Sequence, residues 1–195
     1  MKGPEIEIAC QQVLIEETAV FSMQSMTLPE SLAQDVTAEF LLQRYLKHIR
    51  LFTAGLIQPR QHDDEVAFRL LWSRWNLLRF RIEKSSQPEA GSMLRLQICG
   101  GFLVQADSCD RGELLFEVKP LPNGVSVALQ LSDYCPLLLG GPRPNPWRKG
   151  LYHWTQAALH KLVTIRFLLL LYRDLAGSKA CCRVVRRKVM EGEDI

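Results

Sequence analysis

The sequence predicts an α+β fold in which an antiparallel meander of strands packs against one long C-terminal helix. Five segments between Val66 and Leu131 alternate apolar and polar residues with a period of two, as half-buried strands do. The connections between them are short, which favours antiparallel order because a parallel pair needs a crossover of about a dozen residues. Residues 149–177 then show the longer period of an amphipathic helix.

The composition is that of one ordinary globular domain. The chain has 195 residues, of which 47% are hydrophobic and 23% are charged. We expect a single domain over residues 1–177, followed by a basic and then acidic tail over residues 178–195. The net charge of +3 is too small to favour electrostatic binding of nucleic acid, so no nucleic-acid partner is expected.

The N-terminal part is predicted to hold one strand followed by one or two helices. Residues 5–15 alternate early and predict an opening strand. Thr27 and Glu30 fit a capping box, so a helical region is expected from there to about Gly55, a residue type that closes helices. The polar stretch QPRQHDDE, from Gln58, is predicted to be a loop.

Each strand of the predicted meander has one apolar face that is expected to point into the core. The apolar sets are Phe68, Leu70 and Trp72; Leu78, Phe80 and Ile82; Leu94, Leu96 and Ile98; Leu114, Phe116 and Val118; and Val125, Val127, Leu129 and Leu131. The turns are expected at residues 75–76, 85–92, 107–112 and 120–124.

The C-terminal helix contains the most apolar run of the chain, RFLLLLYR. Its uncharged part runs only from Phe167 to Tyr172, whereas a bilayer span needs about 20 apolar residues, so no transmembrane segment is predicted. At about 100° per residue, one apolar stripe is expected to face the sheet. The stripe consists of Leu151, Trp154, Ala158, Leu162, Ile165, Leu169 and Tyr172, and His153, Gln156, His160 and Thr164 lie opposite.

The second half of this helix is apolar on all sides, because Phe167 and Leu171 lie opposite the stripe. A helix of this kind is covered on more than one side. We therefore expect Phe167 or Leu171 to be covered by the N-terminal helices or by a second subunit, and a homodimer stays an open alternative.

A strand, a helical insertion, an antiparallel meander and a long C-terminal helix form the element order of the helix-grip fold. In this order the chain resembles the START-like superfamily (SRPBCC), which includes polyketide cyclase-like proteins and lipid-transfer domains. The resemblance covers roughly Glu5 to Gly177, and KGLYHWTQAALHKLVTIRFLLLLY is similar to the terminal helix of bacterial members. It implies a curved antiparallel sheet wrapped around the C-terminal helix, one or two helices inserted after the first strand, and a cavity for a hydrophobic ligand.

The resemblance and the apolar faces together predict that a small hydrophobic or amphipathic molecule, lipid- or polyketide-like, binds between the sheet and the C-terminal helix. The expected ligand-binding residues are Trp72, Phe80, Leu96, Phe116, Leu129, Tyr134, Trp154, Leu162, Ile165 and Arg166. Periodicity does not separate a cavity from a filled core, so a core without a ligand stays the alternative.

No catalytic set emerges from the sequence, which favours a binding protein over an enzyme and leaves a cyclase or dehydratase activity open. A cyclase or dehydratase activity would have only Asp133 and Arg166 as candidate residues near the mouth of the cavity. His153 and His160 are two helical turns apart, too far for one metal ion without a third ligand between them, so neither a metal nor a cofactor is expected.

The compartment is predicted from the cysteines and the N-terminus. Six cysteines are present without a C-x-x-C pair, and the first residues lack the apolar run of a secretion signal. Both features predict a reduced, cytoplasmic protein.

The tail supports a second hypothesis, a scaffold or peripheral-membrane protein with a filled core and a basic surface. An apolar helix followed by adjacent cysteines and cations is compatible with acylation and with attraction to anionic lipid. The other interpretation is an edge strand or short helix whose cations are neutralised by nearby acids. The residues concerned are Cys181, Cys182, Arg183, Arg186, Arg187 and Lys188, with the acids Glu191, Glu193 and Asp194.

Overall fold

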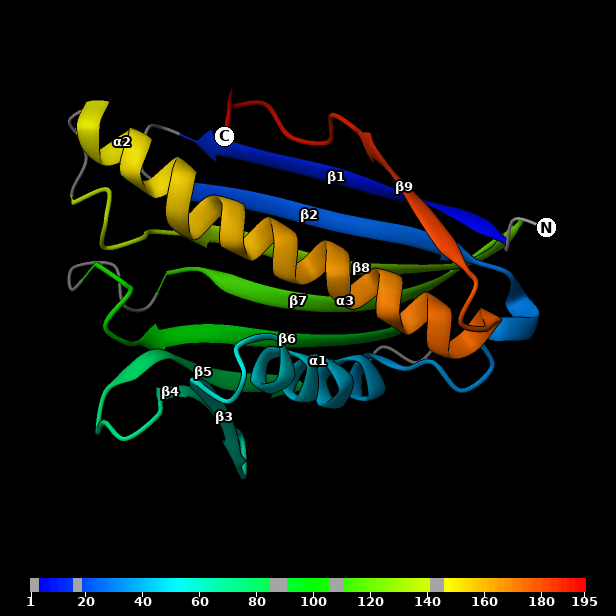
Figure 1. The fold of residues 1–195 in the computed structure, drawn as a ribbon, viewed down its shortest axis with the longest axis horizontal. Coiled ribbons are helices and arrows are strands. Elements are labelled where there is room, and N and C mark those ends of the chain that lie inside the picture. The colour runs from blue at the N-terminus through cyan, green and yellow to red at the C-terminus, as the bar shows by residue number, and fades with distance from the viewer. Residues whose placement is uncertain (1–3, 16–18, 85–90, 106–110, 141–145) are drawn as a thin grey trace.

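A computed structural model describes residues 4–15, 19–84, 91–105, 111–140 and 146–195. The predicted α+β helix-grip architecture is confirmed: one large antiparallel sheet curves around a long C-terminal helix, α3, with a shorter helix, α1, beside it (Figure 1). The strand order is β10-β1-β2-β8-β7-β6-β5-β4-β3, and β9 also pairs with β1. Strands β3 to β8 follow one another in sequence, so the predicted meander is present.

The described elements have these bounds: β1 Glu5–Ile15, β2 Ala19–Leu28, a 3-10 turn Glu30–Leu32, α1 Ala38–Phe52, β3 Ile57–His62, β4 Glu65–Leu70, β5 Asn76–Lys84, β6 Ser92–Gly100, β7 Glu113–Leu121, β8 Gly124–Tyr134, α2 Pro146–Tyr152, a π-helical turn His153–Ala157, α3 Ala158–Ala176, β9 Cys181–Arg186 and β10 Glu193–Asp194. The turns expected at residues 85–92 and 107–112 lie largely outside the described residues.

The N-terminal prediction is wrong in two respects. A second strand, β2, forms a hairpin with β1, and Thr27, the expected helix cap, lies inside that strand opposite Ser126 of β8. The helical insertion therefore follows the second strand, and α1 begins after Thr37, whose hydroxyl accepts from the Phe40 amide at 3.1 Å. The period-two signal of β2 is hidden because two of its buried residues are polar, Ser22 and Gln24.

The stretch from Gln58 is not a loop but the hairpin of β3 and β4. Its turn places Asp63 at φ 49°, a conformation that Asp tolerates better than most residues do. Polar residues dominate β3 because this edge strand is largely exposed, so apolar alternation could not reveal it.

The core lies between the inner face of the sheet and the two helices. Most of the predicted inward residues of the meander are buried, with Trp72 a clear exception, and Phe80, Leu96, Phe116 and Leu129 are each no more than 2% exposed. The ring of Tyr45, in α1, packs edge-on to Phe116 at 5.5 Å between ring centroids. Helix α1 therefore fills the concave side that the meander alone would leave open.

Helix α3 is covered on the side that the sequence left undecided. Phe167 and Leu171 are 3% and 2% exposed, and the Phe167 ring contacts Tyr45 and His48 of α1. The expectation that the N-terminal helical region covers these residues is confirmed. No helix in the described parts of the chain combines the length and the apolar character needed to cross a bilayer.

The first part of the stripe expected to face the sheet lies, however, on the outer side of the helix, whereas its last residue, Tyr172, is buried in the core as expected. Leu151, Trp154 and Leu162 are 51%, 79% and 54% exposed, whereas Thr164, expected outside, is fully buried. Two features explain the error. The sheet beneath the start of the helix is polar, and the π-helical turn His153–Ala157 shifts the angular register that a uniform 100° step assumes.

Candidate functional site

A group of buried polar side chains lies on the inner face of β1 and β2. The register pairs Cys10 with Gln24 and Gln12 with Ser22, and directly paired residues share one face of an antiparallel sheet. All four are at most 5% exposed. We call these residues the polar seam, and they interrupt an otherwise apolar face.

The polar seam is bonded to itself and to the helix. The Gln24 side-chain amide donates to Ser22 Oγ at 3.0 Å and contacts Cys10 Sγ at 3.6 Å. Gln12 Nε2 donates to the carbonyl of Ala157, in the π-helical turn, at 3.1 Å. Among the described residues, Gln24 Oε1 is buried with no hydrogen-bond partner, so the seam keeps an acceptor for a further donor.

The buried side of α3 also carries polar groups. Thr164 Oγ1 donates to the His160 carbonyl at 3.0 Å, and Gln156 Nε2 donates to the hydroxyl of Tyr134 at 2.5 Å. Burial lowers the pKa of His160 to about 4, so its imidazole is neutral at pH 7. The buried side of the helix therefore mixes polar groups such as Thr164 with apolar ones such as Phe167.

A hollow of about 630 Å³ opens beside the polar seam, where β1 forms the edge of the main sheet. We call it the β1 slot. Its lining comes from β1, from the start of α3 and from the C-terminal tail: Cys10, Gln11, Gln12, Val13, Lys161, Arg186, Arg187, Lys188, Met190, Gly192, Asp194 and Ile195. Its volume falls in the range of small-molecule sites, about 300–1,000 Å³.

The tail forms one wall of the slot because it pairs twice with β1. Strand β9 runs parallel to residues 5–10, and β10 returns antiparallel to residues 13–14. Between them the chain passes close to β1 at Gly192, where a Cβ atom would lie 2.8 Å from the Leu14 carbonyl oxygen. The interpretation of the tail as an edge strand agrees with this pairing, and Cys181 and Cys182 are half-buried in it.

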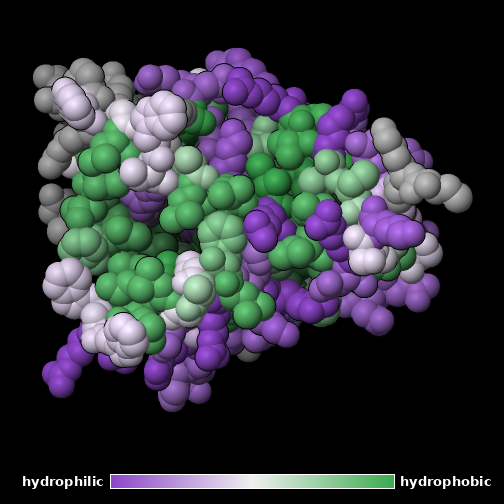
Figure 2. Space-filling view, in the orientation of Figure 1, coloured by the Kyte–Doolittle hydropathy of each residue, from purple (hydrophilic) through white to green (hydrophobic). Residues whose placement is uncertain are grey.

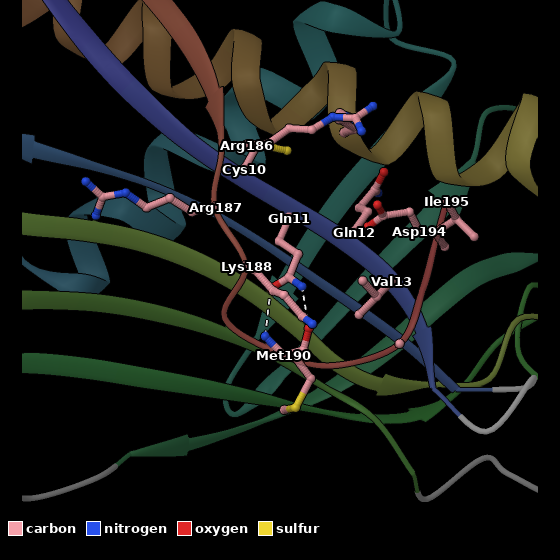
Figure 3. A pocket seen from close by; sticks show the side chains of 12 residues that line it. Cys10, Gln11, Gln12, Val13, Arg186, Arg187, Lys188, Met190, Asp194 and Ile195 are labelled. Atoms are coloured by element: carbon pink, nitrogen blue, oxygen red, sulfur yellow. Dashed lines mark hydrogen bonds between the residues drawn. The ribbon is translucent and has the colours of Figure 1, made fainter.

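One side chain, Gln11, holds the loop of the tail. Its Oε1 accepts from the amide of Val189 at 2.6 Å. The same oxygen accepts from the Met190 amide at 2.8 Å, and Nε2 donates to the Met190 carbonyl at 2.5 Å (Figure 3). Gln11 therefore takes the place of a missing strand partner for residues 189–190.

Replacing Gln11 with alanine is expected to free this loop and to lower the free energy of unfolding by about 1–3 kcal/mol, because the partners lose partly buried hydrogen bonds. Hydrogen exchange at the Val189 and Met190 amides should become faster. Gln43→Ala removes an exposed Gln–Gln hydrogen bond and is the matched control. Unchanged exchange at both amides would contradict the role given to Gln11.

Cations dominate the β1 slot. It is lined by Lys161, Arg186, Arg187 and Lys188 against one acid, Asp194. Arg186 is paired with Cys10 in the parallel register and so lies on the inner side with the polar seam, while Arg187 points in the opposite direction (Figure 3). Within the described part of the chain, neither Lys161 nor Arg186 has an ion pair, so both charges remain available to an anion.

A second hollow, of about 220 Å³, adjoins the slot and is more apolar. Leu14, Leu139 and Tyr152 line it, and it shares Asp194 and Ile195 with the slot. Residues 194–195 thus stand between a cationic space and an apolar one.

The predicted ligand-binding residues are not brought together. Phe80, Leu96, Phe116, Leu129 and Tyr134 are buried in the core. Trp72 was expected on a buried face but is 96% exposed in the turn after β4, at φ 60°. Trp154, Leu162 and Arg166 are exposed on the outer side of the helix, and Ile165 is half-buried.

The two residues considered for catalysis have separate partners. Asp133 forms a two-point ion pair with Arg111, at 2.6 and 3.2 Å, and both are half exposed. The Arg166 guanidinium lies over the Phe52 ring, 6.0 Å from its centroid. In the part of the chain that the structure describes, no cluster of His, Cys, Asp and Glu could hold a metal ion.

The residues of the slot escaped prediction for an identifiable reason. Gln11 and Gln12 stand together inside an apolar strand, CQQVLI, and this was the available signal, because amides buried in a strand need specific partners. Those partners lie 145 to 179 positions away in the chain, so no local pattern could supply them.

Comparison with known proteins finds no matching family model and no matching curated protein. Solved structures similar to the chain include the solution structure of the Aha1 dimer from Colwellia psychrerythraea, with 15% identity and a TM-score of 0.40 over 78% of this chain and 94% of that one. CalU16 from Micromonospora echinospora has 12% identity and a TM-score of 0.33, over 88% of this chain and 96% of that one. An uncharacterized protein from Bacillus thuringiensis has 13% identity and a TM-score of 0.35, over 74% of this chain and 98% of that one. These values carry no functional argument.

Proposed function

We propose that this protein is a START-like binding protein for a small amphipathic acid, held between the edge of the sheet and the C-terminal helix. The acidic group binds in the β1 slot, and the apolar part extends toward Leu14, Leu139 and Tyr152. The observation that carries the proposal is a slot of about 630 Å³ in which Lys161 and Arg186 have no ion pair. The protein acts by binding, without a catalytic step.

The packing of the core supports this location over the centre of the sheet. Phe116 and Leu129, two residues of the expected wall, lie beneath α1 and α3 and are at most 2% exposed. A ligand there would have to displace packed side chains, which costs as much as removing them from the core. The β1 slot is open already.

The chemistry of the lining supports an acid over a neutral molecule. A guanidinium can hold a carboxylate or phosphate through two parallel hydrogen bonds, and an ammonium adds a point charge. Gln12 Nε2 is directed to a helix carbonyl and fixes the wall rather than the ligand. The adjoining apolar hollow favours a ligand that also has a hydrocarbon part.

Calorimetric titration with decanoate, and with decanol as the neutral analogue, tests the proposal. Decanoate should bind at least about tenfold more tightly than decanol, because a hydrogen bond to a charged group contributes about 1.5–3 kcal/mol. Arg186→Gln and Lys161→Gln should each weaken decanoate binding by about tenfold. Arg79→Gln is the matched control and should leave the affinity nearly unchanged, since Arg79 is exposed on β5 and does not line the slot.

Two results would contradict the proposal. One is equal affinity for decanoate and decanol, which would mean that the cations do not select the ligand. The other is an equal loss in Arg186→Gln and Arg79→Gln, which would reflect general charge rather than the slot.

Native mass spectrometry of the freshly purified protein should also reveal a bound acid, which solvent extraction then identifies.

A further inference from the structure

The outer side of α2 and α3 exposes large apolar side chains where a helix of a globular protein normally presents polar ones. Trp147 is 85% exposed and Trp154 79%, and three leucines on the same segment are about half exposed. The three are Leu151, Leu159 and Leu162, at 51%, 48% and 54%. Figure 2 shows apolar residues gathered over the face of the molecule that carries α3.

The same segment carries charge of one sign only. From Pro146 to Tyr172 the sequence contains Arg148, Lys149, Lys161 and Arg166, and the first acid after them is Asp174. Arg166 is exposed between Leu162 and Leu170 on the outer side of α3, and its guanidinium lies near the Phe52 ring. The segment is thus apolar, rich in tryptophan and free of acids, and Arg166 gives its outer face a positive charge.

These properties fit an anionic lipid surface better than a second copy of the chain. Tryptophan side chains are enriched at the boundary between headgroups and hydrocarbon, and a nearby cation adds attraction to anionic lipid. A symmetric dimer through this face would bring together two copies of a segment that contains no acid to offset Arg166. Apolar patches of this kind commonly mark an interaction site.

We propose that the outer face of α2 and α3, formed by Trp147, Leu151, Trp154 and Leu162, docks the protein on anionic membrane surfaces. The helix lies in the plane of the headgroups with its tryptophans inserted, and no segment crosses the bilayer. The face is separate from the β1 slot, so membrane docking does not depend on the proposed ligand.

Flotation of the full chain with vesicles tests this proposal, comparing phosphatidylcholine alone with a mixture of phosphatidylcholine and phosphatidylglycerol. Binding should be at least about tenfold stronger to the mixture and should fall as salt rises. The double variant Trp147→Ala, Trp154→Ala should lose at least about tenfold of this binding. The matched control is Trp72→Ala, which removes another exposed tryptophan, from the turn after β4.

Three outcomes would overturn the proposal: equal binding to both vesicle types, equal loss in the Trp72 variant and the double variant, or a dimer in solution that the double variant abolishes while vesicle binding is absent. Arg166→Glu gives a second test, because it changes the charge without removing an apolar side chain. It should weaken binding to the vesicles that contain phosphatidylglycerol and leave binding to phosphatidylcholine vesicles unchanged. The Arg186→Gln variant should still bind vesicles, which separates this face from the slot.

Discussion

Replacing Phe167 with alanine is expected to lower the free energy of unfolding by about 3–5 kcal/mol, the typical cost of removing a buried aromatic ring. Phe167 is 3% exposed, and its ring lies 5.3 Å from that of Tyr45 and 5.7 Å from that of His48. The ring joins α3 to α1, so its loss leaves a cavity between the two helices. Urea unfolding followed by circular dichroism measures the change.

The control for this prediction is Leu162→Ala, on the outer side of the same helix. Leu162 is 54% exposed, so the change should stay below about 1 kcal/mol. If Leu162→Ala cost as much as Phe167→Ala, the outer side of α3 would be buried in solution, and the orientation of the helix given above would be wrong.

Stability is expected to fall as the pH is lowered from about 6.5 toward 4, with His160 as a main cause. Burial lowers the pKa of His160 from 6.5 to about 4. Between these values the unfolded chain binds a proton that the folded chain does not, so stability rises with pH across this window. The contribution is at most about 3 kcal/mol, fully present above pH 6.5 and lost as the pH falls to 4. Burial also lowers the pKa of His48, which adds to the loss of stability at low pH.

Carboxylates also change the stability in this pH range, and substitution of His160 isolates the contribution of its imidazole. His160→Gln should flatten the dependence of unfolding free energy on pH between 4 and 6.5. The comparison is between the variant and the parent protein at the same pH. An unaltered slope in His160→Gln would show that this imidazole is not held in its neutral form.

The strands of the meander could be predicted from the sequence because burial and alternation agree there. Leu96 and Phe116 are apolar and buried, and their neighbours Arg95 and Glu117 are polar and more exposed. The same logic missed β2, where Ser22 and Gln24 are polar and buried. A pattern of hydropathy reports burial only where buried residues are apolar.

The predicted orientation of α3 was wrong for a related reason. Its outer side carries Trp154 and Leu162, while its inner side carries Thr164 among apolar residues such as Leu168. Apolar residues therefore occur on both sides, and their spacing does not show which side is buried. What decides the orientation is contact with α1 through Phe167, a tertiary interaction that the spacing of residues does not encode. The same exposed outer side carries the proposed membrane contact.

The β1 slot was beyond reach of the sequence because its two walls come from opposite ends of the chain. Gln11 and Val189 are 178 positions apart, yet a hydrogen bond of 2.6 Å joins them. The basic tail was recognised as a candidate for anionic contacts. Its pairing with β1, which turns Arg186 toward the inner side, became visible only in three dimensions.

The location of the ligand site is tested most directly by recording amide spectra of the labelled protein by nuclear magnetic resonance during titration with decanoate. Our account predicts saturable shifts at Gln12, Lys161 and Arg186, at the β1 slot, with Phe80 and Leu96 in the centre of the sheet nearly unchanged. Shifts centred on Phe80 and Leu96, with the slot residues silent, would contradict it and place the ligand inside the core.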